Sequence, residues 1–122
     1  MKKKSQSDKL KQARKKADRK FQETEMAKGS NCELCGAPAV CIHHIIEKSL
    51  SARLRYESIN GIRVCNGCHY KIHNHSDPAI FRKIDAVIGQ ARIKKLETLR
   101  REPVKISLEY YDGIFKALST NK

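Results

Sequence analysis

The sequence predicts a small α+β fold in which a short β-hairpin packs on helices and zinc replaces part of the hydrophobic core. Three observations lead to this prediction: two short β-branched runs before a helical pattern, two CxxC pairs, and few residues suited to a core. Of the 122 residues, 39% are hydrophobic and 6% aromatic, and none is Trp. A domain of this size is marginal without a metal or another covalent staple. We expect a basic arm over 1–29, helical or disordered, a compact core over 30–76 and a helical extension over 77–122.

The first 28 residues are strongly basic, with eleven Lys or Arg against four Asp or Glu. They hold over half of the net charge of +13, which predicts an anionic partner such as nucleic acid, with anionic lipid or simple solubility as alternatives. Leu10, Ala13, Ala17 and Phe21 recur at helical spacing, but this apolar stripe is narrow. We therefore expect a helix here to form on DNA or against the domain, and to fray when alone.

Two β-branched runs, 39–44 and 60–64, predict the strands of a hairpin, and the run 65–75 predicts a helix packed on it. Further helices are expected in the extension, where apolar stripes predict packing surfaces over the hairpin or a dimer seam. Their expected bounds are Pro78 to Gly89 with Ser76 or Asp77 as N-cap, a run through Ile93, Leu96 and Leu99 that Pro103 ends, and Leu108 to about Leu118 with Ser107 as N-cap.

The chain has no apolar run near the eighteen or so residues that a membrane span needs. Residues 1–20 have the charge of a signal peptide without its apolar centre. We therefore expect a cytoplasmic protein with no membrane contact. In a reducing cytosol, cysteines seldom persist as structural disulfides, so the five thiols favour metal binding.

Two CxxC pairs, separated by 29 residues, predict a structural zinc site, because each such turn points two thiolates toward a common tetrahedral centre. The alternatives are that one pair is adventitious or that His69 replaces a cysteine. The fifth cysteine, Cys41, is expected in a strand as a small buried hydrophobic residue. The four predicted zinc ligands are Cys32, Cys35, Cys65 and Cys68.

Four histidines lie in or beside the region between these cysteines. His43 and His44 are adjacent at the end of a predicted strand, so the pleat should point them to opposite faces. His69 and His73 lie four apart in a predicted helix, which places both imidazoles on one face, the spacing by which a helix presents two ligands to a divalent ion. A single histidine is more often structural, but two such pairs joined by a zinc site predict a functional centre.

In order, CxxC, HH, Asn60, CxxCH and a final His resemble the motif of the HNH (ββα-metal) endonucleases over about 32–75. The loop LRYESIN (54–60) and the helical tail are similar to phage recombination endonucleases of the NinG (Rap) type. In that narrower family the positions matching His43 and His69 need not be histidine. At these two positions the chain is more similar to bacterial toxin nucleases. The matched positions are Cys32, Cys35, His43, His44, Asn60, Cys65, Cys68, His69 and His73.

The resemblance implies a ββα-metal core and a role for each matched residue. His44 would be the general base, and His43 and His69 would hold the catalytic ion. His73 would be a third ligand or a contact to the scissile phosphate. Asn60 would brace the loop that carries the base, although Asn before Gly is also an ordinary turn residue. Imidazole ligands suit several divalent ions, so we expect Mg or Mn in the cell, with Ni or Zn as alternatives.

Basic residues surround this motif in the sequence, and we expect them to bind DNA phosphates without reading bases. The implied function is metal-dependent DNA hydrolysis, selective for branched recombination intermediates or weakly sequence-specific, in a phage or bacterial setting. One alternative is a non-catalytic zinc-dependent DNA-binding module. Another is an accessory protein whose tail, with Leu96, Leu99, Tyr110, Tyr111 and Phe115, binds a partner or a second copy. The predicted phosphate contacts are Lys48, Arg53, Arg55 and Arg63.

Overall fold

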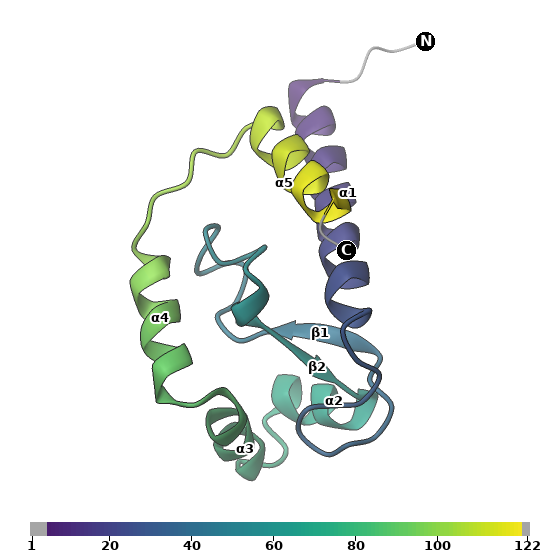
Figure 1. Ribbon diagram of the computed structural model, residues 1–122, viewed down its shortest axis with the longest axis vertical. Coiled ribbons are helices and arrows are strands. Elements are labelled where there is room, and N and C mark those ends of the chain that lie inside the picture. The colour runs from purple at the N-terminus through teal and green to yellow at the C-terminus, as the bar shows by residue number, and fades with distance from the viewer. Residues whose placement is uncertain (1–4, 121–122) are drawn as a thin grey trace.

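The computed structural model describes residues 5–120 and is mixed α+β, mostly helical with one two-stranded sheet (Figure 1). The α+β class predicted from the sequence is confirmed. None of the helices in the described range combines the length and the apolar character of a membrane span. In chain order the elements are α1 (Gln6–Met26), β1 (Cys41–His44), the 3-10 turn η1 (Ser58–Asn60), β2 (Gly61–Val64), α2 (Asn66–Asn74), α3 (Ala79–Ile88), α4 (Gln90–Arg100) and α5 (Leu108–Thr120).

The two strands form an antiparallel pair in which Cys41 lies opposite Val64 and His44 opposite Gly61. β1 begins at Cys41, two residues later than predicted, because the preceding chain turns away to bond with residue 30 near the first cysteine pair. The buried face of the hairpin packs on α2 and α3. This main core consists of Cys32, Ile62, Val64, Cys68, Ile72, Ile80, Ile84 and Ile88.

Helix α1 runs through 21 residues of the basic segment and packs against both β1 and α5. The Ser5 side chain accepts a hydrogen bond from the backbone of Asp8 and so caps the first turn. Ala17 and Phe21, from the narrow apolar stripe, are 0% and 1% exposed. The helix therefore belongs to the folded domain, and its basic side chains project from an element that packs on the core.

The extension runs around the hairpin and returns to α1 (Figure 1). Gly89 ends α3 at φ +78°, a conformation that favours glycine, and α4 follows immediately. The predicted cap Ser107 is confirmed, since it accepts from the backbone N–H of residue 110. The N-cap of α3 is Pro78 in place of the predicted Ser76 or Asp77, although Asp77 accepts from the backbone N–H of residue 79. Leu96 and Tyr111 are 1% and 6% exposed, so these two residues pack inside this chain.

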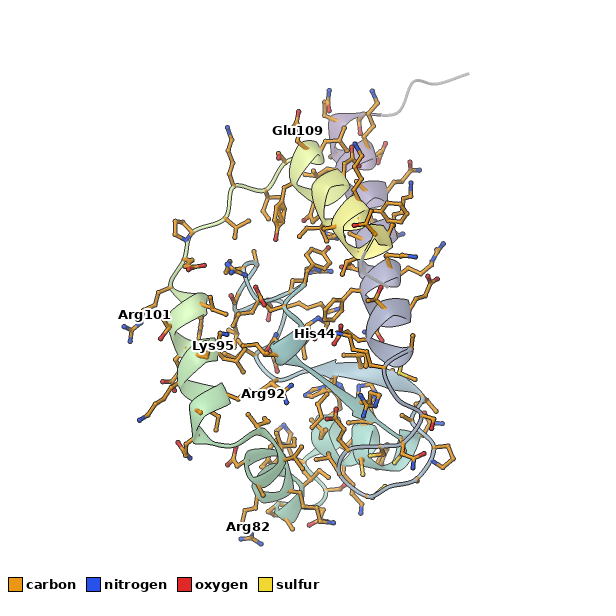
Figure 2. The ribbon with its side chains drawn as sticks, viewed as in Figure 1. His44, Arg82, Arg92, Lys95, Arg101 and Glu109 are labelled. Carbon is orange, nitrogen blue, oxygen red and sulfur yellow. The ribbon has the colours of Figure 1, made fainter. Side chains whose placement is uncertain are left out.

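Arg92 joins α4 to the hairpin (Figure 2). Its Nε donates to the carbonyl of Ile59 at 2.6 Å, and its Nη2 donates to that of Gly61 at 2.8 Å. The two carbonyls flank Asn60, so the guanidinium holds the backbone on both sides of that residue. Sequence patterns did not indicate this role, because an arginine on a helix face is ordinarily exposed.

Replacing Arg92 with Met should keep the length of the side chain and remove both hydrogen bonds. Charged hydrogen bonds to neutral partners contribute about 1.5–3 kcal/mol each, and water can partly replace them at this half-buried position, so we expect a loss of about 1–3 kcal/mol. Urea unfolding followed by circular dichroism measures this loss. The control is Arg82→Met on the exposed face of α3 (Figure 2), and equal stabilities of the two variants would contradict the role of Arg92.

Candidate functional site

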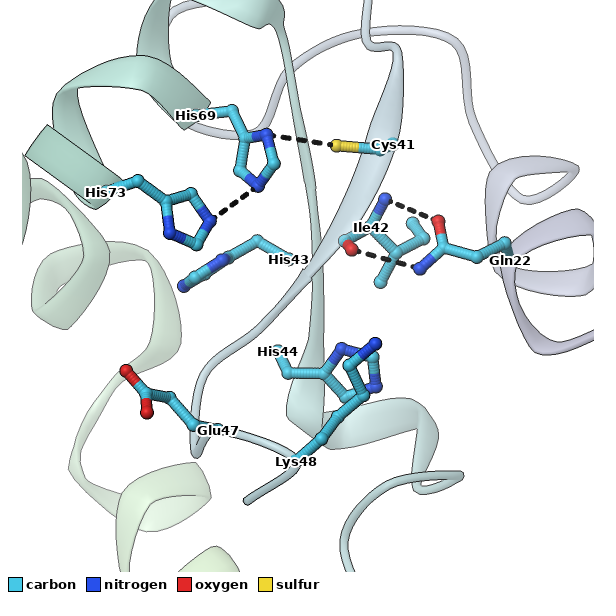
Figure 3. A pocket seen from close by; sticks show the side chains of 9 residues that line it. All are labelled: Gln22, Cys41, Ile42, His43, His44, Glu47, Lys48, His69 and His73. Carbon is cyan, nitrogen blue, oxygen red and sulfur yellow. Dashed lines mark hydrogen bonds between the residues drawn. The ribbon is translucent and has the colours of Figure 1, made fainter. Parts of the chain in front are cut away.

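The pleat of β1 separates its two histidines, as predicted. His43 faces the side chains of α2, whereas His44 lies on the other face of the strand beside α1 (Figure 3). Both histidines line a single pocket of about 380 Å³. The adjacent imidazoles therefore have different partners but open onto the same space.

Three histidines converge on one face of the hairpin. The ligand nitrogens of His43, His69 and His73 lie within 4.8 Å of one another, so this cluster can hold a metal ion. The i,i+4 spacing on α2 brings the Nε2 atoms of His69 and His73 to 2.8 Å. Burial and the two neighbouring histidines lower the pKa of His43 to about 4. His43 is therefore neutral at pH 7, as a metal ligand must be.

Cys41 belongs to the surroundings of this cluster. Its Sγ lies 3.7 Å from Nδ1 of His69, and the residue is half-buried (Figure 3). Cys41 lies in the strand as predicted and packs against the main core, but it is only partly buried because β1 points its thiol toward α2. With Nδ1 of His69 directed at sulfur, Nε2 is the nitrogen that faces the other histidines.

His44 is 9% exposed and held on two sides. The ring of Phe21 lies against it, with 5.4 Å between ring centroids, and Nε2 is 2.9 Å from the carbonyl oxygen of Arg55. A carbonyl can only accept, so Nε2 carries the proton and Nδ1 of the neutral ring keeps its lone pair. Burial lowers the pKa of His44, against the opposing effect of the hydrogen bond to Arg55. The ring is thus held as a neutral proton acceptor.

Asn60 is fully buried and holds the loop that follows β1. Its Oδ1 accepts from the backbone of Ile46 at 2.8 Å, while Nδ2 donates to the carbonyls of Ile46 at 3.0 Å and Leu54 at 3.1 Å. A side-chain amide that makes three backbone hydrogen bonds connects the two ends of this loop. This geometry is that of a brace, and it is more than a turn residue requires.

The two CxxC pairs meet and form a cluster that can hold a structural metal such as zinc. The Sγ atoms lie within 4.8 Å of one another, and those of Cys35 and Cys65 are 3.5 Å apart. Tetrahedral zinc with bonds of about 2.3 Å places its sulfurs about 3.8 Å apart, which fits this spacing. Although burial raises it, hydrogen bonds from backbone N–H groups lower the pKa of Cys32 to about 7, whereas burial and the neighbouring thiols raise the pKa of Cys68. Zinc would therefore have to displace protons as it binds.

The four basic residues expected to contact phosphate have different surroundings. Lys48 is exposed and lines the pocket beside His44. Arg53 forms ion pairs with Glu57 and Glu102. The guanidinium of Arg53 is thus occupied within the chain. The guanidinium of Arg55 is also occupied, because it forms an ion pair with a carboxylate of α1. Arg63 donates to a backbone carbonyl of the first cysteine loop.

Three residues near the site were not singled out from the sequence. Gln22 and Glu47 line the main pocket, and Arg19 lines a neighbouring hollow of about 130 Å³. That hollow is also lined by Gln22, His44 and Lys48, so the two spaces adjoin at these residues. The apolar stripe that ends at Phe21 was the available signal that this part of the helix faces the core.

Replacing Cys65 with Ser should release the structural zinc and destabilise the fold. Bound zinc contributes to the free energy of unfolding. If the variant binds zinc a hundredfold more weakly, and the wild-type site is near saturation, this contribution falls by about 2.7 kcal/mol. Metal analysis of the purified protein and thermal unfolding measure both effects. The matched control is Cys41→Ser, which should keep the zinc, and equal zinc content in the two variants would contradict the assignment.

No family model matches the chain, and no solved structure was found to be similar. A 49-residue segment is 41% identical to part of a protein named mitochondrial DNA mismatch repair protein mutS homolog, from Sarcophyton glaucum. The match covers 37% of this chain and 5% of that relative. The similarity is thus to one short segment of a much longer protein.

Proposed function

We propose that this protein is a metal-dependent endonuclease with an HNH-type centre that hydrolyses DNA phosphodiester bonds. The observation that carries the proposal is the arrangement around β1. Three imidazoles converge at metal-ligand distances on one face, and a fourth, His44, opens onto the same pocket as an oriented proton acceptor. A hairpin followed by a helix, with these residues on it, is what the HNH resemblance predicts.

Hydrolysis requires a nucleophilic water and stabilisation of the charge that builds up on the phosphate. Nδ1 of His44 accepts the proton of the attacking water as its oxygen bonds to phosphorus and the bond to the leaving 3′ oxygen breaks. His43, His69 and His73 would hold a divalent ion, which would supply positive charge to stabilise the phosphate and the leaving oxygen. Arg55 holds the far nitrogen of the His44 ring through its backbone carbonyl, and Asn60 holds the loop between them.

The proposed substrate is DNA, for reasons of charge and resemblance. The net charge of +13 favours a polyanion, and Lys48 and Arg19 lie along the hollows that lead to His44. The relative that matches in part carries DNA mismatch repair in its name. Branched recombination intermediates are the preferred form of this substrate, by the similarity to NinG-type endonucleases.

A non-catalytic zinc-dependent DNA-binding module is the second candidate, because the cysteine cluster and the charge are common to both. A closed four-cysteine site needs no histidine cluster beside it, so this candidate leaves the convergence of His43, His69 and His73 without a purpose. It becomes the preferred function if the wild-type protein binds DNA and cuts none.

Replacing His44 with Ala should abolish metal-dependent cleavage while zinc content and DNA affinity persist. Loss of a general base typically lowers the rate by about 10²–10⁴-fold. The measurement is strand cutting of a labelled duplex and a labelled four-way junction, with Mg or Mn and without metal. Cuts confined to the junction would support a recombination role, and equal cleavage by the variant would exclude His44 as the base.

Replacing Lys48 with Gln should weaken DNA binding and reduce its dependence on salt. Losing one phosphate contact lowers the slope of log K against log salt by about 0.9 on duplex DNA. Binding is measured with the His44→Ala protein as background, so that no substrate is consumed. The control is Arg101→Gln at the far end of α4 (Figure 2), and equal slopes for the two variants would remove Lys48 from the binding surface.

A further inference from the structure

We propose that α1 is a positioning element of the nuclease centre, in which Asp18 orients the His44 imidazole through Arg55 and Gln22 holds the backbone of β1. This inference rests on the proposed function. Asp18, Phe21 and Gln22 have the spacing i, i+3, i+4, so one face of α1 carries all three contacts to the site. The chemical role of this helix is thus separate from its basic charge.

Asp18 holds Arg55 with two parallel hydrogen bonds. Nε of Arg55 donates to Oδ1 at 2.8 Å and Nη2 donates to Oδ2 at 2.6 Å, while the Tyr56 hydroxyl donates to Oδ1 at 2.8 Å. The side chains of Arg55 and Asp18 are 19% and 28% exposed. A forked pair of this kind fixes orientation as well as distance, because the guanidinium and the carboxylate are both planar.

The same arginine holds the proposed base with its backbone. Its carbonyl oxygen accepts from Nε2–H of His44 at 2.9 Å, and this bond selects the tautomer that leaves Nδ1 free. Arg55 lies in a loop outside any helix or strand, between β1 and η1. The ion pair to Asp18 anchors that loop to a helix, so it fixes where the carbonyl points.

Gln22 supplies β1 with a hydrogen-bonding partner on the edge that β2 does not cover. Its amide oxygen Oε1 accepts from the backbone N–H of Ile42 at 2.9 Å, and its Nε2 donates to the carbonyl of Ile42 at 3.1 Å (Figure 3). A side-chain amide thus replaces one residue of a neighbouring strand. Because Ile42 directly precedes His43 and His44, this contact fixes the strand where both histidines leave it.

Removing the charge of Asp18 should lower kcat with little effect on KM. In Asp18→Asn, one carboxylate oxygen becomes an NH₂ group that meets the donors of Arg55, so the forked pair is lost. Removing a residue that orients a catalytic group typically costs about 10–100-fold, and we expect a fall of that size in kcat. Glu23→Gln makes the same charge change at an exposed position of α1 and should keep wild-type kcat. Asp18→Glu should restore part of the activity.

A second measurement tests the geometry without cleavage. Long-range ¹H–¹⁵N NMR of the imidazoles should show His44 protonated at Nε2 in the wild type and a mixture of tautomers in Asp18→Asn. Zinc content and circular dichroism of the variant should match the wild type. An unchanged His44 tautomer or an unchanged kcat in Asp18→Asn would overturn the inference. If the wild type cuts no DNA, the proposed function fails while the NMR comparison still decides the positioning role.

A double-mutant cycle tests whether Asp18 acts through Arg55. If it does, the fall in kcat in Asp18→Asn with Arg55→Met should equal that of Arg55→Met alone, because both changes break the same link. If the two effects on kcat instead multiply in the double variant, Asp18 acts by another route and the proposed link through Arg55 is wrong.

Gln22→Met, which keeps the side-chain length, should also lower kcat. Its effect on kcat should multiply with that of Asp18→Asn, because Gln22 holds β1 separately.

Discussion

The candidate site depends on the backbone of β1, a strand of four residues, being held in place on both of its edges. A strand this short has few hydrogen bonds of its own, and a two-stranded sheet is marginally stable alone. Here β2 pairs with one edge and Gln22 of α1 pairs with the other. The alternation of side chains along a fixed strand then sends His43 toward α2 and His44 toward α1.

The cysteine cluster holds the element that carries the other two histidines. Cys65 is the N-cap of α2 and Cys68 lies in its first turn, so the cluster includes the start of this helix. His69 follows directly, and His73 lies one turn later on the same face. A zinc ion in the cluster would therefore set the position of α2 relative to the first cysteine pair, and with it the position of two imidazoles.

The rest of the chain compensates for a small core. Helix α5 packs along α1, Arg92 of α4 bonds to the backbone on both sides of Asn60, and Glu102 pairs with Arg53 of the loop. These contacts add to those that Asn60 and Asp18 make with the same irregular segment. Polar contacts between the ends of the chain and the loop thus do part of what apolar burial does in larger domains.

The order of helices, the Ser107 cap and the two CxxC pairs were predictable, because each depends on residues that are close in sequence. Helical period, strand alternation and ligand spacing are local rules, and they placed Cys32, Cys35, Cys65 and Cys68 in one cluster and His69 and His73 on one face. Separate strand and helix patterns could not indicate that His43 joins that face, which the resemblance alone implied, or that Cys41 lies beside it.

The sequence by itself determined the local elements and the residue types of both clusters. Only the tertiary structure decided how the distant charges pair, because Asp18 and Arg55 are 37 residues apart and each is an ordinary surface residue in its own segment. Arg53 likewise pairs with Glu102, which is 49 residues away, while Lys48 lies at the pocket. Which side chains face one another depends on how whole elements pack, and the spacing of residues within one element does not predict that packing.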